Sequence, residues 1–216
     1  MIPTRILFPV EQEAQIRLLE NLKNHSGQIS LLALRPADTV ETTIAWKIAL
    51  ENNKTPTALL LSRQNIEDIP VNGVSRYEDA LAAEKGAYIV MKDDGVPDVV
   101  LVASGSEVST LLAGAKKLRE EKGLKVQVVS AISEGLFREQ SKDYQKEVIP
   151  DFLPIFGLTA GIPVTLQGLV GSQGKVFGLE SFGYSAPYKV LDEKFGFTGE
   201  NVYNQVINYL EEWNLT

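Results

Sequence analysis

The sequence contains no cysteine, which excludes disulfides, thiolate nucleophiles and cysteine-ligated metals. Because this absence is typical of proteins in a reducing compartment, we expect the protein to be cytoplasmic. Histidine is nearly absent as well, since His25 is the single one in 216 residues. A histidine-rich metal site is therefore impossible, and a Ser-His-acid triad would have to use this residue. Its polar neighbours favour a surface loop, and we predict no metal site in this chain.

Basic residues are also few, with 21 Lys and Arg against 28 Asp and Glu and a net charge of −7. Contacts to phosphate backbones need clustered basic side chains, so we predict no nucleic-acid partner. Long apolar runs are missing, because none approaches the ~20 residues that a membrane span requires. The N-terminal apolar patch is short and lacks a small-residue cleavage site. Neither membrane insertion nor a signal peptide is therefore predicted.

The pattern that is present begins with two apolar strands and a helix. Residues 28–34 and 57–61 have the short, largely apolar character of buried strands, and residues 39–51 that of a helix. Asp38 is the expected N-cap of this helix, and Glu41 is placed to complete a capping box. The strands are too apolar for an exposed edge, which predicts a parallel βαβ unit covered on both faces.

Residues 1–70 nevertheless look incomplete, because a two-stranded parallel piece cannot bury both of its faces. Residues 71–85 contain Gly73 and scattered charges, and we interpret them as a linker between domains. Residues 86–216 carry a second alternation of strands and helices. The fold class is therefore α/β, with an incomplete parallel βαβ unit followed by a larger α/β domain.

Within this larger domain, the predicted strands are residues 87–91, 99–103, 126–129, 154–158, 165–170 and 175–180. The predicted helices follow residue 106 and cover 143–148, 187–195 and 199–213. Asp93-Asp94-Gly95 separates the first two strands and is a hairpin turn signal, which predicts that these two strands form a hairpin.

Arg63 is the strongest candidate for a ligand contact. It follows the carboxyl end of a buried parallel strand, which is where open α/β sheets bind their ligands. A guanidinium there can hold a phosphate or a carboxylate in a bidentate fork. The alternative is that Arg63 is tied into an ion pair near the linker.

Ser104, Gly105 and Ser106 form a weaker candidate. They lie in a strand-to-helix turn, and small residues at the N-terminus of a helix are a generic anion site. The alternative is a simple capping box between Ser104 and Glu107. We identify no catalytic residue from the sequence.

Several blocks, taken in order, resemble transketolase. They are Pro9-Val10-Glu11-Gln12, Arg35-Pro36-Ala37-Asp38, Pro56-Thr57-Ala58-Leu59, Leu61-Ser62-Arg63-Gln64-Asn65, Ala103-Ser104-Gly105-Ser106-Glu107, Ser185-Ala186-Pro187 and Phe195-Gly196-Phe197-Thr198. Together they run from about Pro9 to the C-terminus. Deoxyxylulose-phosphate synthase and the β-subunits of 2-oxo acid dehydrogenases share the domain plan but not this set of blocks.

This resemblance implies a thiamine-diphosphate enzyme, with Mg²⁺ or Ca²⁺, that moves a two-carbon ketol unit between sugar phosphates in the pentose phosphate pathway. It implies that residues 1–70 end a pyrimidine-binding domain and that residues 86–216 are a complete C-terminal domain with a mostly parallel sheet of about five strands. It also implies a homo-oligomer, expected to be a dimer. Arg63 matches the arginine that binds the substrate phosphate.

The sequence also departs from the family pattern. It holds no counterpart of the diphosphate domain with its metal ligands, nor of the early pyrimidine domain with its activating glutamate. Leu7 stands where the family has a substrate-contacting histidine, and a leucine cannot donate a hydrogen bond. We therefore predict that this chain alone binds no cofactor and is inactive, and that it serves dimerisation, scaffolding and substrate-phosphate binding. The alternatives are a stand-alone binding or regulatory module, or the second chain of a split transketolase that pairs with the missing N-terminal domains.

Overall fold

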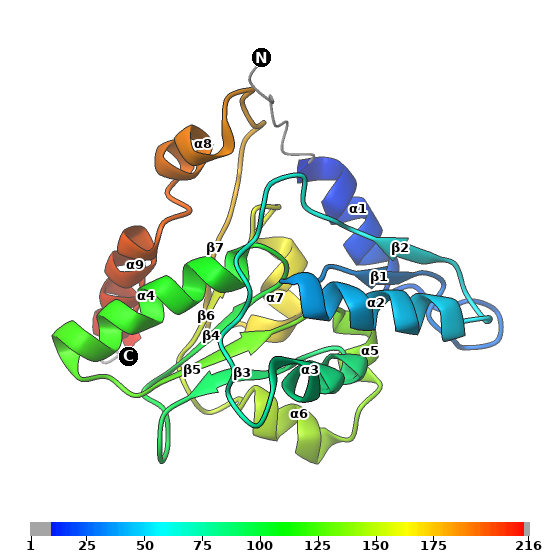
Figure 1. Ribbon diagram of the computed structural model, residues 1–216, viewed down its shortest axis with the longest axis horizontal. Coiled ribbons are helices and arrows are strands. Elements are labelled where there is room, and N and C mark those ends of the chain that lie inside the picture. The colour runs from blue at the N-terminus through cyan, green and yellow to red at the C-terminus, as the bar shows by residue number, and fades with distance from the viewer. Residues whose placement is uncertain (1–9, 214–216) are drawn as a thin grey trace.

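The computed structural model describes residues 10–213, which form two separate β-sheets and the helices that cover them (Figure 1). The smaller sheet is the βαβ unit that the sequence predicts. Strands β1 (Leu32–Leu34) and β2 (Thr57–Leu59) pair in parallel, and helix α2 (Thr39–Glu51) connects them. Helix α1 (Val10–Leu19) precedes β1, and no pattern in the sequence predicted it.

The N-terminus of α2 confirms part of the predicted capping box. The Asp38 carboxylate accepts a hydrogen bond from the Glu41 N–H at 2.7 Å, as an N-cap residue does. The Glu41 carboxylate does not return to Asp38 and instead accepts from the Ala37 N–H at 2.8 Å. Glu41 is fully buried, so its carboxylate is available to link α2 to other elements.

The segment between the two sheets is partly helical. Helix α3 (Arg76–Ala80) and the 3₁₀ helix η1 (Leu81–Lys85) form the last two thirds of residues 71–85, and both contact α2. Ser75 caps α3 through its side chain. The chain therefore crosses from one sheet to the other as packed structure, and the division into two domains stays a prediction.

The larger sheet has five strands in the order β3-β5-β4-β6-β7. Its strands are β3 (Tyr88–Lys92), β4 (Val99–Ala103), β5 (Val126–Ser130), β6 (Ile155–Leu158) and β7 (Lys175–Phe177). β3 is antiparallel to β5, and all other neighbours are parallel. The predicted mostly parallel sheet of about five strands is confirmed.

The predicted hairpin between β3 and β4 is wrong, because β5 lies between these strands. The acidic residues of the connection bind the beginning of β5 instead. The Asp93 carboxylate accepts from the Val126 N–H at 2.9 Å, and Asp98 accepts from the Lys125 N–H at 2.8 Å. These acidic side chains therefore do not close a hairpin, and they accept hydrogen bonds from backbone N–H groups far along the chain.

The strand predicted at residues 165–170 is also wrong, because this stretch lies in helix α7 (Val164–Val170). Its buried residues are Thr165, Leu166, Leu169 and Val170, which share one helical face. A short apolar run cannot be assigned to helix or strand by its periodicity alone. Packing of this face under the sheet decides in favour of the helix.

The remaining helices are α4 (Glu107–Lys122), α5 (Glu134–Arg138), α6 (Lys142–Val148), α8 (Tyr188–Phe195) and α9 (Gly199–Trp213). α4 packs closely on α9, and a Cβ added at Gly114 would overlap Val202. No helix within residues 10–213 has both the length and the apolar character that crossing a bilayer requires.

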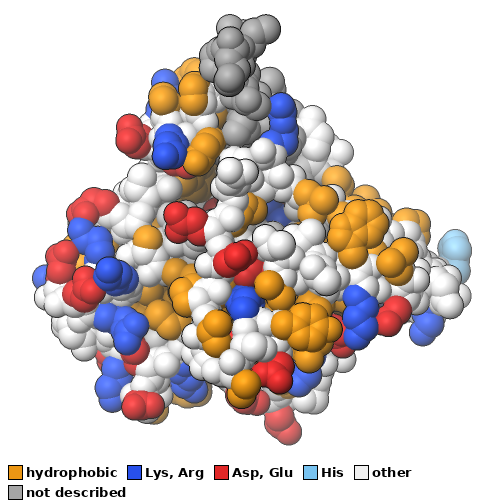
Figure 2. Space-filling model, in the orientation of Figure 1, with side chains coloured by type: hydrophobic (Ala, Val, Ile, Leu, Met, Phe, Trp, Pro, Cys, Tyr) orange, Lys and Arg blue, Asp and Glu red, His pale blue; other side chains and the backbone are white. Residues whose placement is uncertain are grey.

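One hydrophobic core joins the two sheets. Leu34 and Ile44 from the first unit belong to the same buried cluster as Val90, Leu101 and Leu111 from the second. The first unit is therefore ordered by docking on the larger sheet. Apolar side chains also remain on the surface over α2 and α3 (Figure 2).

Candidate functional site

Arg63 lies where the sequence placed it, shortly after the carboxyl end of β2. Its side chain belongs to an exposed segment. No hydrogen bond or ion pair of its guanidinium is found within residues 10–213, so the ion-pair alternative is not supported there. The guanidinium is available to a ligand.

A pocket of about 370 Å³ lies beside this segment. Its lining comes from both units of the chain, and includes Arg63, Ser62, Gln64, Arg35, Gly105 and Ser106. The fold thus brings the two predicted sites together, although they are far apart in the sequence. Leu60, Leu61 and Ala160 supply apolar surface.

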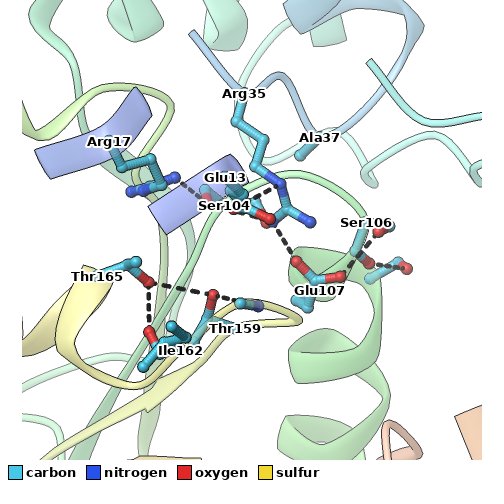
Figure 3. A network of polar contacts seen from close by, with 12 residues as sticks. Glu13, Arg17, Arg35, Ala37, Ser104, Ser106, Glu107, Thr159, Ile162 and Thr165 are labelled. Atoms are coloured by element: carbon cyan, nitrogen blue, oxygen red, sulfur yellow. Dashed lines mark hydrogen bonds and ion pairs between the residues drawn. The ribbon is translucent and has the colours of Figure 1, made fainter. Parts of the chain in front are cut away.

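Arg35 belongs to the same pocket but is already paired. Its guanidinium forms ion pairs with Glu107 and with Glu13, the latter at 3.2 Å from Nε to Oε1 (Figure 3). Burial works against the charged form of Arg35, but the charges of Glu107 and Glu13 outweigh it and raise the pKa of this guanidinium. Arg35 is therefore a fixed structural cation, whereas Arg63 has no such pairing within residues 10–213.

Ser104 does not form the predicted capping box. It is buried, and its hydroxyl oxygen accepts a hydrogen bond from Arg17 Nη1 at 2.7 Å (Figure 3). The residue at the N-cap position of α4 is Ser106, whose hydroxyl makes no capping bond to the backbone. It donates instead to the Glu107 carboxylate at 2.9 Å. The capping-box alternative is therefore wrong, because Glu107 is directed at Arg35.

Gly105 allows the turn to pass beneath Arg35. Its φ of +63° lies in the left-handed region, and a Cβ would come within 2.8 Å of Arg35 Cζ. Its own N–H already donates to the Arg35 carbonyl at 3.1 Å. Of the three residues proposed for an anion site, Gly105 and Ser106 line the pocket, and anion binding there stays a prediction.

Sequence analysis did not identify two residues that contact Arg35 and Ser104. Glu13 and Arg17 are both buried and lie on α1, four residues apart. Nε and Nη2 of Arg17 have no hydrogen-bond partner in the described part of the chain. An acid and a base at this spacing on a helix were a usable signal, but α1 itself had not been predicted.

His25 is exposed in a loop, as expected. Within residues 10–213 no three His, Cys, Asp or Glu residues gather in a way that could hold a metal ion. Leu7 lies outside the described residues.

The chain thus combines a parallel βαβ unit, with Arg63 exposed after its second strand, and a following five-stranded, mostly parallel α/β unit. Residues 86–198 match the family model of the transketolase-like TK C-terminal domain. The chain therefore belongs to the transketolase family.

Particular relatives extend the match over nearly the whole chain. It is 41% identical over 206 residues to the transketolase of Aquifex aeolicus, covering 95% of this chain and 28% of that protein. It is 40% identical over 197 residues to transketolase 2 of Vibrio parahaemolyticus, covering 91% of this chain and 28% of that protein. The chain thus spans about 28% of the length of these relatives.

Solved structures agree with this match. The transketolase of Leishmania mexicana superposes with a TM-score of 0.79 at 36% identity, over 94% of this chain and 27% of its own. A split-gene transketolase, described as an inactive beta4 tetramer, gives a TM-score of 0.70 at 20% identity, over 94% of this chain and 62% of its own. The second likeness concerns the fold alone.

Proposed function

We propose that these residues form the C-terminal part of a thiamine-diphosphate-dependent transketolase, in which Arg63 binds the phosphate of the sugar substrate. The observation that carries the proposal is the guanidinium of Arg63, which follows the carboxyl end of β2 beside a pocket of about 370 Å³ and has no partner among the described residues. One related transketolase structure, from Pichia stipitis, is a complex with sedoheptulose-7-phosphate. A phosphorylated sugar is therefore the ligand that we assign to this pocket.

Arg63 would act by binding and orienting the phosphorylated end of the substrate. A guanidinium offers two parallel N–H donors to a phosphate, and its charge does not depend on pH in the physiological range. Arg35 cannot replace it, because Glu13 and Glu107 already occupy its guanidinium. Ser62 and Gln64 line the same pocket and are the nearest polar candidates to assist.

Thiamine diphosphate, with Mg²⁺ or Ca²⁺, would supply the ketol-transfer chemistry in a complete enzyme. The described residues do not fit a binding role for the metal ion, because they include no group of three His, Cys, Asp or Glu residues that could hold it. We therefore derive no catalytic step from this chain. We propose that the 216-residue chain by itself is catalytically inactive and provides scaffold, dimer contacts and the phosphate-binding arginine.

One alternative is that this chain is the second chain of a split enzyme. In that case the partner would be a separate polypeptide with the diphosphate domain. A stand-alone regulatory module is the other alternative. It would use the C-terminal domain alone and would bind no sugar phosphate through Arg63.

A chimera tests the proposal. Residues 10–216 of this chain would replace the corresponding stretch of the Aquifex aeolicus transketolase, whose own residues would precede them. We expect ketol transfer between sugar phosphates by the chimera, and neither transfer nor thiamine-diphosphate binding by the isolated 216-residue chain.

Turnover and calorimetry would decide the outcome. A chimera that folds, dimerises and binds the cofactor but transfers no ketol unit would contradict the proposal. Micromolar cofactor binding by the isolated chain would contradict its predicted incompleteness.

A further inference from the structure

Among the described residues, backbone hydrogen bonds hold the segment that carries Arg63 at its two ends. Residues 61–68, here called the Arg63 loop, are exposed or half-buried throughout. Before the loop, the Leu60 N–H donates to the Leu34 carbonyl at 2.9 Å, which continues the pairing of β2 with β1. After the loop, the side chain of Ile69 enters the core and its N–H donates to Asp38 Oδ2 at 3.1 Å. The position of Arg63 therefore depends on these two anchors.

Asp38 connects the second anchor to two other segments. Its Oδ1 caps α2 through the Glu41 N–H at 2.7 Å, whereas its Oδ2 accepts from Ile69 N–H and from Arg76 Nε, the latter at 2.6 Å. The side chain of Asp38 is completely buried. One carboxylate therefore has two separable tasks, one oxygen for the helix and one for the end of the loop.

Arg76 is the cation that compensates the buried charge of Asp38. It begins α3, and only 9% of its side chain is exposed. Its Nη2 lies 3.4 Å from Glu41 Oε1, and its guanidinium lies 5.8 Å from the centre of the Tyr88 ring in β3. Because a buried carboxylate without its cation is strongly unfavourable, Arg76 determines whether Asp38 can hold the loop.

We propose that Asp38 and Arg76 are positioning residues for phosphate recognition by Arg63. They fix the C-terminal end of the Arg63 loop, so that the guanidinium lies beside the pocket before the ligand arrives. This inference rests on the proposed phosphate role of Arg63. The proposed effect is preorganisation of the loop. When fewer molecules hold the binding geometry, the apparent dissociation constant increases in proportion to the reciprocal of that fraction.

Asp38→Asn separates the two tasks of the carboxylate. The amide oxygen of an asparagine can still accept from the Glu41 N–H and cap α2, since Asn is as good an N-cap as Asp. The amide nitrogen cannot accept from Ile69 or Arg76, because it is a donor. The variant therefore keeps the helix cap and removes the loop anchor.

The experiment uses the 216-residue chain with two readouts. Hydrogen exchange reports the order of residues 61–69, and titration with D-ribose 5-phosphate, with D-ribose as the control, reports phosphate binding. In Asp38→Asn we expect faster exchange confined to residues 61–69. If the loop then holds the binding geometry one time in ten, the dissociation constant for ribose 5-phosphate rises about tenfold. Arg76→Lys, which keeps a cation with fewer donors, should show the same pattern more weakly.

Ser141→Ala is the matched control, because it removes an N-cap side chain from α6, which does not line the pocket. It should change neither exchange in the loop nor affinity. Faster loop exchange with unchanged affinity in both Asp38→Asn and Arg76→Lys would overturn the positioning role, as would unchanged exchange in both.

The proposed function fails in a different way. If the wild-type chain binds ribose 5-phosphate no better than Arg63→Ala does, Arg63 is not the phosphate ligand, and the positioning role falls with it. Loop exchange in Asp38→Asn would still show whether the anchor exists. Should Asp38→Asn fail to fold, Arg76→Lys decides alone.

Discussion

Arg63 and Arg35 lie at one pocket but have opposite environments. Arg35 is buried between Glu13 and Glu107, and its charge is neutralised by these two internal ion pairs. Arg63 is exposed and has no partner within residues 10–213. A ligand with a phosphate group gains most from the second kind of arginine, because no internal ion pair has to be broken first.

Arg63→Ala in the chimeric enzyme should mainly raise the KM for phosphorylated substrates. The loss of a charged hydrogen bond is worth about 1.5–3 kcal/mol, which corresponds to roughly 10- to 150-fold in KM, with kcat little changed. Steady-state kinetics with phosphorylated and unphosphorylated acceptors would measure it. Lys54→Ala, which removes an exposed cation outside this pocket, is the control. An equal effect on both kinds of acceptor would rule out a phosphate role.

Glu41 is a second residue whose surroundings can be tested. It is fully buried, and it accepts a hydrogen bond from the Tyr88 hydroxyl at 2.7 Å. Burial raises the pKa of Glu41, while the bonds from Tyr88 and from the Ala37 N–H act against this. The contact joins α2 to β3 and so connects the two sheets.

Tyr88→Phe should therefore lower the free energy of unfolding by about 1–3 kcal/mol, the usual cost of leaving a buried acceptor with one bond fewer. Urea denaturation at pH 7 would measure the change. Tyr184→Phe, at a residue that is 55% exposed, is the matched control and should have almost no effect. Equal stabilities of the two variants would mean that the Tyr88 hydroxyl contributes nothing.

At the scale of an element, α8 carries a carboxyl group with an unusual affinity for protons. Burial, and then the charge of Glu107 at the start of α4, raise the pKa of Asp192 from 3.8 to about 6. Between these two values the folded state holds a proton that the unfolded state has lost. The stabilising contribution of this proton is complete below pH 3.8 and is lost as the pH rises through about 6.

Asp192→Asn should remove this dependence. Because the side chain is partly exposed, we expect a gain of only about 1 kcal/mol at pH 7, with little change at pH 4. Thermal or urea unfolding across this pH range would show the flatter profile. Glu193→Gln removes a charge from the neighbouring, exposed position of α8 and is the control. If the pH profile of Asp192→Asn matched the wild type, the carboxyl would not be the group that titrates.

At the scale of the whole molecule, exposed apolar side chains predict self-association. Trp46 and Leu50 on α2 are 50% and 80% exposed, and Tyr77 on α3 is 53% exposed. β1 and β2 form a sheet of only two strands in the described part of the chain. Open edges and apolar patches tend to be covered by another chain.

We expect light scattering to give a dimer or a larger species rather than a 23.7 kDa monomer. Trp46→Glu should shift the distribution toward the monomer, because it places a charge in the apolar patch. Glu120→Gln on the exposed face of α4 is the control. A clean monomer for the wild type would contradict the prediction.

Local patterns predicted the elements whose signals lie within a few neighbouring residues. Residues 39–51 and 199–213 form helices with the predicted bounds, because caps and periodicity are local properties. Arg63 could be placed at a strand end because β2 is short and bounded by clear breaks. The resemblance to transketolase likewise depended on short blocks in a fixed order.

Tertiary structure alone decided the contacts between distant segments. A two-stranded unit was expected to leave one of its faces unburied, yet Leu32 in β1 is only 3% exposed because the first sheet shares its core with the second. The position of β5 between β3 and β4, and the helix at residues 164–170, depend on packing that no local window contains. The same holds for Glu107. The predicted capping box would have used its carboxylate, but in the folded chain this carboxylate pairs with Arg35, because a buried guanidinium without an anion is strongly unfavourable.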